Sequence, residues 1–369
     1  MVYVGMSGGV DSSVAAALLK RGGTEVVGVF IKSWDMPGFP CDWREDRRDA
    51  MRVAARLGIP LVTLDLTAEY QRTVINYLVR EYRVGRTPNP DVECNRAIKF
   101  GVFLSWALER GADFVATGHY ARIRRHSPLT MHGQNGKCKT SSDCRLLRAK
   151  DENKDQTYFL WTLAQEQLAR CLFPVGEYTK PEVRRLAKRF GLSTAEKKDS
   201  QGLCFVGKID VKEFLKKYIK PHRGEVLDEK GKVIGYHDGA AFYTIGERHG
   251  FVATRHGDSR PYYVVAKEVV KNILVVSQTP PALESKAGRI ILSRVNWISG
   301  ERPVARKTCL ARIRHRGELT SCWLNYDGDV VEVLPQQTLV AVAAGQSLVL
   351  YDRQECLGGG VIDRVEAFY

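Results

Sequence analysis

The sequence predicts a parallel α/β domain followed by small β domains or barrels. Strand and helix signals alternate over the first 120 residues, and short β runs dominate after Gly224. A chain of 369 residues is too long for one ordinary core, so two or three domains are expected. Hydrophobic residues make up 44% and charged residues 27%, an average globular composition. No apolar run approaches the roughly twenty residues that a membrane span needs, so no membrane contact is expected.

The first 120 residues alternate between strands and helices. The predicted strands cover residues 2–6, 25–32, 61–66 and 113–117. The predicted helices cover residues 12–21, 44–57, 67–83 and 98–110. This order is typical of a parallel sheet with helices on both faces, whose ligands bind at the carboxyl ends of the strands.

The middle of the chain differs from the rest in charge. Between Gly176 and Arg223 there are 13 Lys or Arg and six Asp or Glu, so these 48 residues carry half of the formal net charge of +14. Basic patches concentrate and steer nucleic acid, which favours a polyanionic partner. A basic but otherwise ordinary enzyme would have the same overall charge.

Turn-forming residues suggest the domain boundaries. Residues 124–143 break the pattern with Gly, Ser, His, Asn and Lys, and are expected to form an exposed insertion. The expected divisions are an N-terminal domain over 1–164, a helical extension over 165–220, a small central domain over 221–285 and a C-terminal domain over 286–369.

The string Ser7-Gly-Gly-Val-Asp-Ser-Ser13 lies between the first predicted strand and the first predicted helix. Glycines let backbone N–H groups approach an anion, the helix N-terminus adds its dipole, and Ser12 and Ser13 add hydroxyl donors. Neither Gly-x-Gly-x-x-Gly nor the Lys-Ser/Thr ending of the Walker loop is present. A capped glycine turn is the alternative, but the longer string matches the loop of enzymes that split ATP into AMP and pyrophosphate. We expect Asp11 to help hold Mg²⁺ at the leaving pyrophosphate.

Cys94 follows the proline-stiffened segment Arg86-Thr-Pro-Asn-Pro-Asp91. A thiol near a helix N-terminus, beside Arg96, Lys99 and the arginine that opens the segment, is expected to have a depressed pKa and to be partly thiolate. A buried structural cysteine is the alternative, but apolar neighbours are lacking in this segment. Asp91 is expected to act as acid or base on a group that Cys94 also approaches, although a turn-forming Asp after proline would look the same.

A second candidate thiol, Cys204, lies in the polar segment 197–207. Two lysines and flanking glycines suit a thiol that a protein partner must reach, and two such cysteines suggest thiol exchange. Five other cysteines have ordinary apolar or mixed surroundings and are expected to be structural: Cys41, Cys171, Cys309, Cys322 and Cys356. Cys138 and Cys144 lie in or beside the insertion, without a full ligand set for a metal ion.

The nine cysteines include no Cys-x-x-Cys pair, which argues against a secreted disulfide framework and against a zinc ribbon. Residues 1–6 read as a short strand without a charged leader. We therefore expect a reducing compartment, the cytoplasm or alternatively an organelle matrix.

A series of longer motifs follows in one order along nearly the whole chain. They occupy residues 5–12, 85–100, 116–120, 153–156, 173–176, 198–205, 261–265, 345–347 and 356–360. Together they resemble the tRNA-specific 2-thiouridylases of the MnmA type. The resemblance implies an N-terminal PP-loop domain of the adenine nucleotide α-hydrolase type, a small central α+β domain and a C-terminal β-barrel.

The resemblance also implies roles for particular residues. Cys204 would receive a persulfide sulfur from a donor protein, and Cys94 would be the catalytic nucleophile. The residues implied to bind ATP are Gly5, Met6, Ser7, Gly8, Gly9, Val10, Asp11, Ser12, Ile31 and Gly118. Those implied to hold the target base are Asn89, Pro90 and Asp91. Those implied to contact tRNA are His119, Lys154, Asp155, Gln156, Arg314, His315 and Gln346.

The implied reaction uses ATP and Mg²⁺ to adenylate the C2 oxygen of the wobble uridine, and a persulfide then supplies sulfur. The partners would be the anticodon stem-loop of tRNA, a persulfide donor protein or relay, and an external reductant that resets a Cys94–Cys204 disulfide. One alternative is another enzyme that splits ATP, such as a ligase, but ligases do not need paired thiols. The other is a non-catalytic RNA-binding protein, against which the intact phosphate loop argues.

Overall fold

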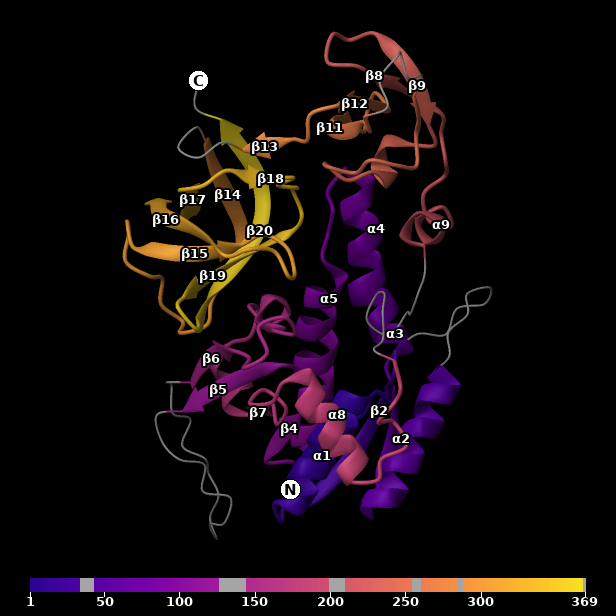
Figure 1. The fold of residues 1–369 in the computed structure, drawn as a ribbon, viewed down its shortest axis with the longest axis vertical. Helices are drawn as coiled ribbons and strands as arrows, with labels where there is room; N and C mark the ends of the chain where they lie inside the picture. The colour runs from indigo at the N-terminus through magenta and orange to yellow at the C-terminus, as the bar shows by residue number, and fades with distance from the viewer. Residues whose placement is uncertain (34–42, 126–143, 199–209, 254–259, 284–287, 368–369) are drawn as a thin grey trace.

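The computed structural model describes residues 1–33, 43–125, 144–198, 210–253, 260–283 and 288–367. Figure 1 shows a parallel sheet with its helices at the bottom, a small sheet at the upper right and a β-barrel at the upper left. The predicted order of a parallel α/β domain, a small central domain and a C-terminal barrel is confirmed.

The N-terminal sheet has the strand order β3-β2-β1-β4-β7, and all four pairings are parallel. Its strands are β1 (Val2–Gly5), β2 (Val26–Lys32), β3 (Leu61–Asp65), β4 (Phe114–Ala116) and β7 (Cys171–Leu172). The strand order reverses between β1 and β4, so the connections that leave the carboxyl ends of these two strands run in opposite directions. Ligands of open α/β sheets bind at such a switch point.

Helices cover both faces of this sheet because its strands alternate their apolar side chains. Val2 and Val4 of β1 belong to one core cluster and Tyr3 to the other. On the first face lie α1 (Val10–Arg21), α2 (Trp43–Leu57) and α8 (Lys180–Arg189). On the second lie two helical stretches. The first contains α3 (Thr67–Tyr70), η1 (Gln71–Ile75) and α4 (Asn76–Arg83), and the second α5 (Pro90–Glu93), η2 (Cys94–Val102) and α6 (Phe103–Glu109).

The central sheet has the order β10-β9-β8-β12-β11. Its strands are β8 (Gly224–Leu227), β9 (Val233–His237), β10 (Val252–Ala253), β11 (Tyr263–Glu268) and β12 (Ile273–Ser277). The short helix α9 (Val211–Leu215) buries Phe214 and Leu215 against the sheet. The same cluster includes residues of α4, so one continuous core joins the central domain to the N-terminal domain.

The C-terminal barrel closes because β14 (Gly288–Trp297) pairs with both β17 (Val330–Pro335) and β20 (Glu355–Ala367). Between them run β16 (Thr320–Asp327), β15 (Thr308–Arg312) and β19 (Ser347–Asp352). Two short strands, β13 (Ala282–Leu283) and β18 (Leu339–Val340), pair beside the barrel.

Two strands from the first half of the chain extend the barrel sheet. β5 (Ala121–Arg125) pairs with β6 (Cys144–Arg148), and β6 pairs with β20. Arg124 and Arg125, expected in the exposed insertion, therefore belong to a strand, and residues 126–143 lie outside the described part of the chain. The expected domain boundaries remain predictions.

The remaining short elements are η3 (Thr157–Phe159), α7 (Gln165–Ala169) and η4 (Ala240–Phe242). Within the described residues, no helix is long and apolar enough to cross a membrane.

Candidate active site

The phosphate loop turns sharply between β1 and α1. Gly8 has a φ of +74°, and a Cβ there would lie 2.2 Å from the Asp46 carbonyl oxygen of α2. Gly9 is the N-cap residue of α1, so the free backbone N–H groups of the first helical turn point toward the switch point. Only glycine fits at position 8, both because of the left-handed backbone and because α2 is so close.

The serine hydroxyls of this loop mainly stabilise its shape. The Ser12 and Ser13 hydroxyls donate to the Gly9 carbonyl oxygen at 3.1 and 2.7 Å, and the Ser7 backbone N–H donates to the Ser12 hydroxyl at 3.2 Å. The prediction that Ser12 and Ser13 donate to the phosphate stays a prediction, and it requires these hydroxyls to turn away from the Gly9 carbonyl oxygen. The Ser7 side chain is exposed.

Gly118, which follows β4, packs directly on the phosphate loop. A Cβ at this position would lie 2.5 Å from the Ser12 backbone nitrogen. Ile31 is buried on β2, while Met6 and Val10 are buried beneath the loop. The structure thus brings the predicted ATP-binding residues together around the switch point, Met6 and Val10 with their side chains in the core.

Asp11 has two partners that the sequence did not reveal. Both of its carboxylate oxygens accept from Lys180 Nζ at 2.8 Å, and one accepts from the Tyr120 hydroxyl at 2.8 Å. Lys180 begins α8 and is only 7% exposed, so its charge is largely shielded from water. The signal in the sequence was weak, because Thr179 to Glu182 reads only as a helix-capping box.

The predicted base-binding residues Asn89, Pro90 and Asp91 begin α5. The Asn89 side chain caps this helix by accepting from the Val92 N–H at 3.3 Å, and Pro90 occupies the first helical turn, where a missing N–H does no harm. The Asp91 side chain is partly exposed. These residues adjoin a cavity of about 200 Å³ between the N-terminal domain and the barrel, which Asn89, Arg96, Trp161 and Arg294 help to line.

Cys94 is fully buried, with an exposed fraction of 0%. It packs in the core cluster that contains Tyr70, Ile98 and Phe103. The expectation that this thiol lacks apolar neighbours is therefore wrong. Ile98 follows about one turn later in the same helical stretch, where the local sequence already shows it, whereas Tyr70 comes from α3 and is not detected by reading the local segment.

The cations expected beside Cys94 are paired with carboxylates or packed against other groups. Arg96 donates to Glu93 at 3.0 Å. Lys99 Nζ lies 3.5 Å from His119 Nε2. Cys204, the second predicted thiol, lies outside the described residues, as do Cys41 and Cys138.

The remaining cysteines fit structural roles where the structure describes them. Cys144 is buried on β6, and Cys171, Cys309, Cys322 and Cys356 are buried as well. Burial raises the pKa of each of the last four thiols, that of Cys309 to about 11, which makes them poor nucleophiles. Within the described residues no cluster of three metal-ligating side chains occurs.

Two of the predicted tRNA contacts are buried. His119 packs against Phe100 and Phe173, its Nδ1 lies 2.7 Å from the Thr117 hydroxyl, and burial beside Lys99 holds its pKa well below the usual range. The Asp155 side chain accepts from Arg312 Nη1 of the barrel at 3.0 Å and has no exposed surface. Neither side chain faces solvent in this structure, so a tRNA contact through them would need a rearrangement.

The other predicted tRNA contacts lie nearer the surface. Arg314 is exposed, whereas Lys154 and Gln156 are partly exposed. His315 stacks on Phe159 with ring centroids 4.6 Å apart, and burial together with Arg316 lowers its pKa to about 4, so it is neutral at pH 7. The Gln346 side chain donates to the backbone of residues 87 and 88.

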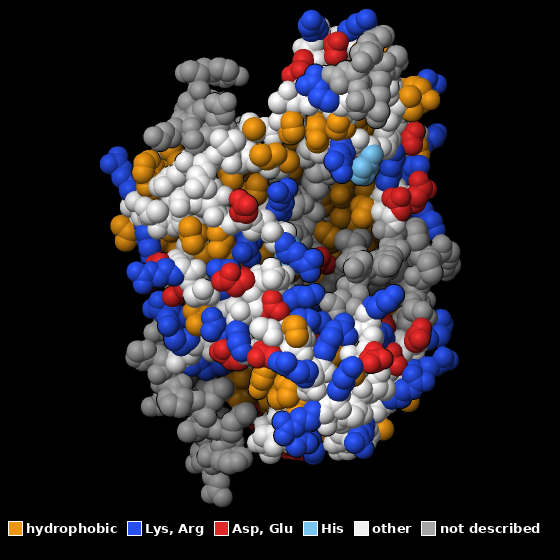
Figure 2. Space-filling view, viewed as in Figure 1, with side chains coloured by type: hydrophobic (Ala, Val, Ile, Leu, Met, Phe, Trp, Pro, Cys, Tyr) orange, Lys and Arg blue, Asp and Glu red, His pale blue; other side chains and the backbone are white. Residues whose placement is uncertain are grey.

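Basic side chains are spread over the N-terminal domain on the face shown in Figure 2. On α8, Arg185, Lys188 and Arg189 are exposed. Arg184 differs, because its guanidinium donates to the carbonyl oxygens of Ala195 and Lys197 at 2.9 and 3.0 Å. Only three of the four cations at this end of α8 therefore face solvent.

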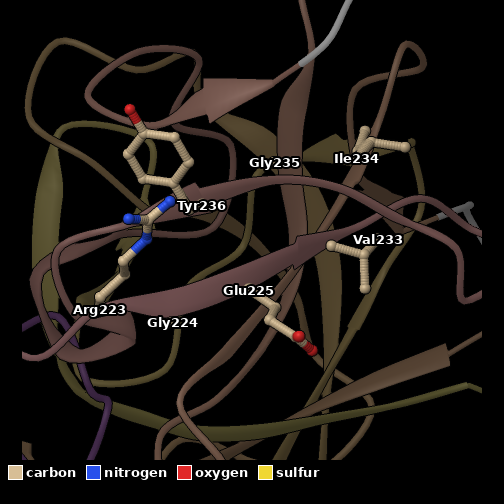
Figure 3. A pocket seen from close by; sticks show the side chains of 7 residues that line it. All are labelled: Arg223, Gly224, Glu225, Val233, Ile234, Gly235 and Tyr236. Atoms are coloured by element: carbon tan, nitrogen blue, oxygen red, sulfur yellow. The ribbon is translucent and has the colours of Figure 1, made fainter.

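A larger open cavity of about 680 Å³ lies on the central sheet, lined by residues of β8 and β9 (Figure 3). The Arg223 guanidinium lies 4.0 Å from the centroid of the Tyr236 ring. None of the lining residues is a predicted site residue, so this cavity does not belong to the site around the phosphate loop.

Comparisons with known proteins match three consecutive segments. Residues 1–208 match the tRNA methyl transferase HUP domain, residues 212–278 the tRNA methyl transferase PRC-barrel domain and residues 287–362 the aminomethyltransferase β-barrel domain. The chain is 43% identical over 367 residues to the tRNA-specific 2-thiouridylases MnmA of Bacillus cytotoxicus and Bacillus anthracis, covering 99% of this chain and 95% of each relative. Among solved structures, the U34-tRNA thiolase NcsA of Methanococcus maripaludis is 18% identical with a TM-score of 0.36, covering 59% of this chain and 66% of that one.

Proposed function

The chain belongs to the MnmA family of tRNA-specific 2-thiouridylases, and from this premise we propose that it uses ATP to replace the C2 oxygen of the wobble uridine by sulfur. The observation that carries the proposal is the phosphate loop at the switch point of the parallel sheet. Gly118 keeps a side chain away from the first turn of α1, and Gly8 permits the left-handed turn of the loop beside α2. An anionic triphosphate fits the N–H groups and the dipole of that turn.

ATP is needed because the uridine is unreactive. Its C2 carbonyl is a poor electrophile, and its oxygen is a poor leaving group. In the proposed first step, the C2 oxygen attacks the α-phosphorus of ATP and pyrophosphate leaves. In the second step, sulfur attacks C2, and the oxygen departs with AMP.

Asp11 and Lys180 would act at the leaving pyrophosphate. Mg²⁺ in nucleotide sites is commonly held by one or two carboxylates together with phosphate oxygens, so a single Asp11 carboxylate fits this requirement. Bound there, Mg²⁺ would neutralise charge on the phosphates. Lys180 fixes the orientation of the Asp11 carboxylate. Because the Lys180 ammonium lies beside the phosphate loop, it would turn toward the phosphates when the nucleotide binds.

Sulfur would arrive as a persulfide on Cys204, supplied by a donor protein. In one route the terminal sulfur attacks C2 and AMP leaves, and the Cys94 thiolate then attacks the Cys204 sulfur, which breaks the S–S bond and releases 2-thiouridine. In the other route the Cys94 thiolate attacks the Cys204 sulfur first, and the sulfide that leaves then attacks C2. Both routes end in a Cys94–Cys204 disulfide, which an external thiol must reduce. Because Cys94 is fully buried, the segment around it must open for this step. A reducing compartment such as the cytoplasm would supply the reductant.

The tRNA would bind across the seam between the N-terminal domain and the barrel. Asn89, Pro90 and Asp91 would hold the target base beside the cavity there, after the base has left the anticodon stack. The exposed cations of α8 and Arg314 would contact phosphates. His119, Lys154, Asp155, Gln156 and His315 remain further candidates for tRNA contact, the two buried ones only after a rearrangement.

Nucleoside analysis tests the proposal. Unmodified tRNA is incubated with the full chain, ATP, Mg²⁺ and a sulfide source, then digested and separated by mass. We expect 2-thiouridine at the wobble position, with AMP and pyrophosphate in equal amounts. Pyrophosphate formation without any thiolated nucleoside would instead indicate another modification by an enzyme that splits ATP.

A further inference from the structure

Residues 85–88, which we call the junction loop, lie immediately before Asn89 and contact all three domains. The loop connects α4 to α5 within the N-terminal domain. Its other contacts come from the central domain and from the barrel, more than 150 residues away in sequence. The position of the base-binding residues therefore depends on elements outside their own domain.

The barrel binds the backbone of the junction loop. The Thr87 N–H donates to the Ala344 carbonyl oxygen at 2.8 Å, and Gln346 Nε2 donates to the carbonyl oxygens of Thr87 and Pro88 at 2.9 and 3.2 Å. Gly345 has a φ of +94°, and a Cβ there would lie 2.8 Å from the Thr87 nitrogen. The barrel backbone thus approaches the loop as closely as glycine permits.

Arg86 makes a second connection to the barrel. Its guanidinium donates to Asp363 Oδ1 at 2.9 Å and to the Ile362 carbonyl oxygen at 3.0 Å. Its Nε lies 3.1 Å from a Glu81 carboxylate oxygen at the end of α4. One partly buried guanidinium therefore joins β20 to the helix that precedes the loop.

The central domain also contacts the loop. The Thr87 hydroxyl donates to the Thr244 hydroxyl at 3.1 Å. Gly85 has a φ of +77°, and a Cβ there would lie 2.6 Å from the Val269 side chain. The loop is consequently held by both domains.

We propose that Gln346 is a positioning residue that fixes the backbone of Thr87 and Pro88 and thereby places Asn89 to Asp91 for the target base. The inference rests on the proposed base-binding role of those three residues. Two carbonyl oxygens can be bonded only by the amide nitrogen of a glutamine, so the orientation of this side chain is determined. The Gln346 backbone is also paired, its N–H with Ala343 and its carbonyl with Ile362. Direct tRNA contact, which the family resemblance implies for Gln346, would compete with these bonds.

Two substitutions at this position separate positioning from tRNA contact. Gln346→Glu keeps the shape but places a carboxylate oxygen against two carbonyl oxygens. Gln346→Lys keeps a donor with three N–H groups. Gln354→Glu makes the same charge change on an exposed barrel residue and is the matched control. For each variant, kcat for thiolation and the Kd for tRNA are measured with the full chain, and thermal melting confirms folding.

Displacement of reacting groups by about 1 Å can cost roughly 100-fold in rate. We therefore expect kcat of Gln346→Glu to fall by about tenfold to 100-fold while its Kd for tRNA stays within about threefold of the control. Gln346→Lys should recover most of the rate. If Gln346→Glu does not fold, Asp363→Asn, which weakens the Arg86 connection, should show a smaller loss of kcat with the same unchanged Kd.

A direct tRNA contact would give the opposite pattern. Gln346→Glu would weaken tRNA binding by tenfold or more, Gln346→Lys would tighten it, and kcat at saturating tRNA would be unchanged. Equal loss of kcat in both variants would also overturn the proposal, because donor retention would then have no effect. A failure of the proposed function itself would appear in the unmutated chain, which would form no 2-thiouridine.

Discussion

The phosphate loop and the segment around Cys94 are both expected to react with the same uridine, yet they are built differently. The loop is formed by neighbours in sequence, residues 5–13, and its glycines leave the first turn of α1 accessible. The Cys94 segment is held by the barrel and the central domain through the junction loop, and the thiol itself is buried. On the proposed roles, a preformed loop for ATP is combined with a buried thiol for sulfur transfer.

This difference has a chemical consequence. Adenylated uridine would be open to hydrolysis, so a thiol that becomes accessible only after tRNA is bound protects the intermediate and the thiol alike. The structure therefore favours an order in which ATP binds first to a ready loop and Cys94 is exposed later. The following predictions test the two sides of this comparison, from the largest expected effect to the smallest.

The thiols should differ in an all-or-none way. Because the persulfide is expected to form on Cys204 before Cys94 takes part, the Cys94→Ser variant should acquire one extra sulfur from a persulfide donor, and Cys204→Ser should acquire none. Intact-mass spectrometry before and after treatment with a reducing thiol measures the adduct. An adduct found on Cys94 instead would reverse the assigned roles.

Lys180→Met should strongly impair the phosphate loop. Loss of a buried ammonium removes the charged partner of the Asp11 carboxylate and leaves the Tyr120 hydroxyl bonded to it, and removal of one preorganised donor typically costs about 100-fold or more in rate. We expect tRNA-dependent pyrophosphate release to fall by about this factor, with partial recovery in Lys180→Arg. Lys20→Met, at an exposed position of α1, is the control. Unchanged pyrophosphate release would remove Lys180 from the site.

Alkylation should report the closed state of Cys94. Since its exposed fraction is 0%, iodoacetamide should modify it at least about tenfold more slowly in the folded chain than in the urea-unfolded chain. Peptide mass mapping identifies the modified residue. Addition of tRNA and ATP should increase the rate. Rapid modification of Cys94 in the folded chain alone would contradict a closed sulfur site.

The smallest effect is expected on α8. Reversing two exposed charges, Arg185→Glu with Lys188→Glu, should weaken tRNA binding modestly. The plot of the logarithm of the association constant against the logarithm of the salt concentration should become less steep, by about one for each phosphate that the helix no longer neutralises. The double variant Lys20→Glu with Lys230→Glu, at two exposed positions outside α8, makes the same change in net charge and is the control. An identical slope for both variants would show that α8 does not face the tRNA.

The features that could be predicted from the sequence are those built by neighbours in sequence, and the features that could not are those built by distant segments. The strands and helices of the N-terminal domain and the phosphate loop depend on local patterns, and the structure has them where the patterns place them. The Lys180–Asp11 pair joins residues 169 positions apart, and the sequence shows only a capped helix at Lys180. The burial of Cys94 and the pairing of β6 with β20 likewise arise from packing between distant segments.

The structure also shows partners of individual side chains that the sequence did not indicate. The family resemblance implies a tRNA contact for Asp155, but its buried side chain pairs with Arg312 of the barrel. The hydroxyls of Ser12 and Ser13, predicted to donate to phosphate, donate in this structure to the Gly9 carbonyl oxygen of their own turn. In each case the residue type indicated what kind of hydrogen bond the side chain makes, but not which group it bonds.

The central claim is that activation of uridine at the phosphate loop does not require the thiols. Its most direct test is tRNA-dependent pyrophosphate release by the variants Cys94→Ser, Cys204→Ser and Asp11→Ala. We predict that both cysteine variants still release pyrophosphate when tRNA is added, without forming 2-thiouridine, and that Asp11→Ala releases almost none while binding tRNA nearly normally. Loss of pyrophosphate release in the cysteine variants, or its persistence in Asp11→Ala, would contradict the claim.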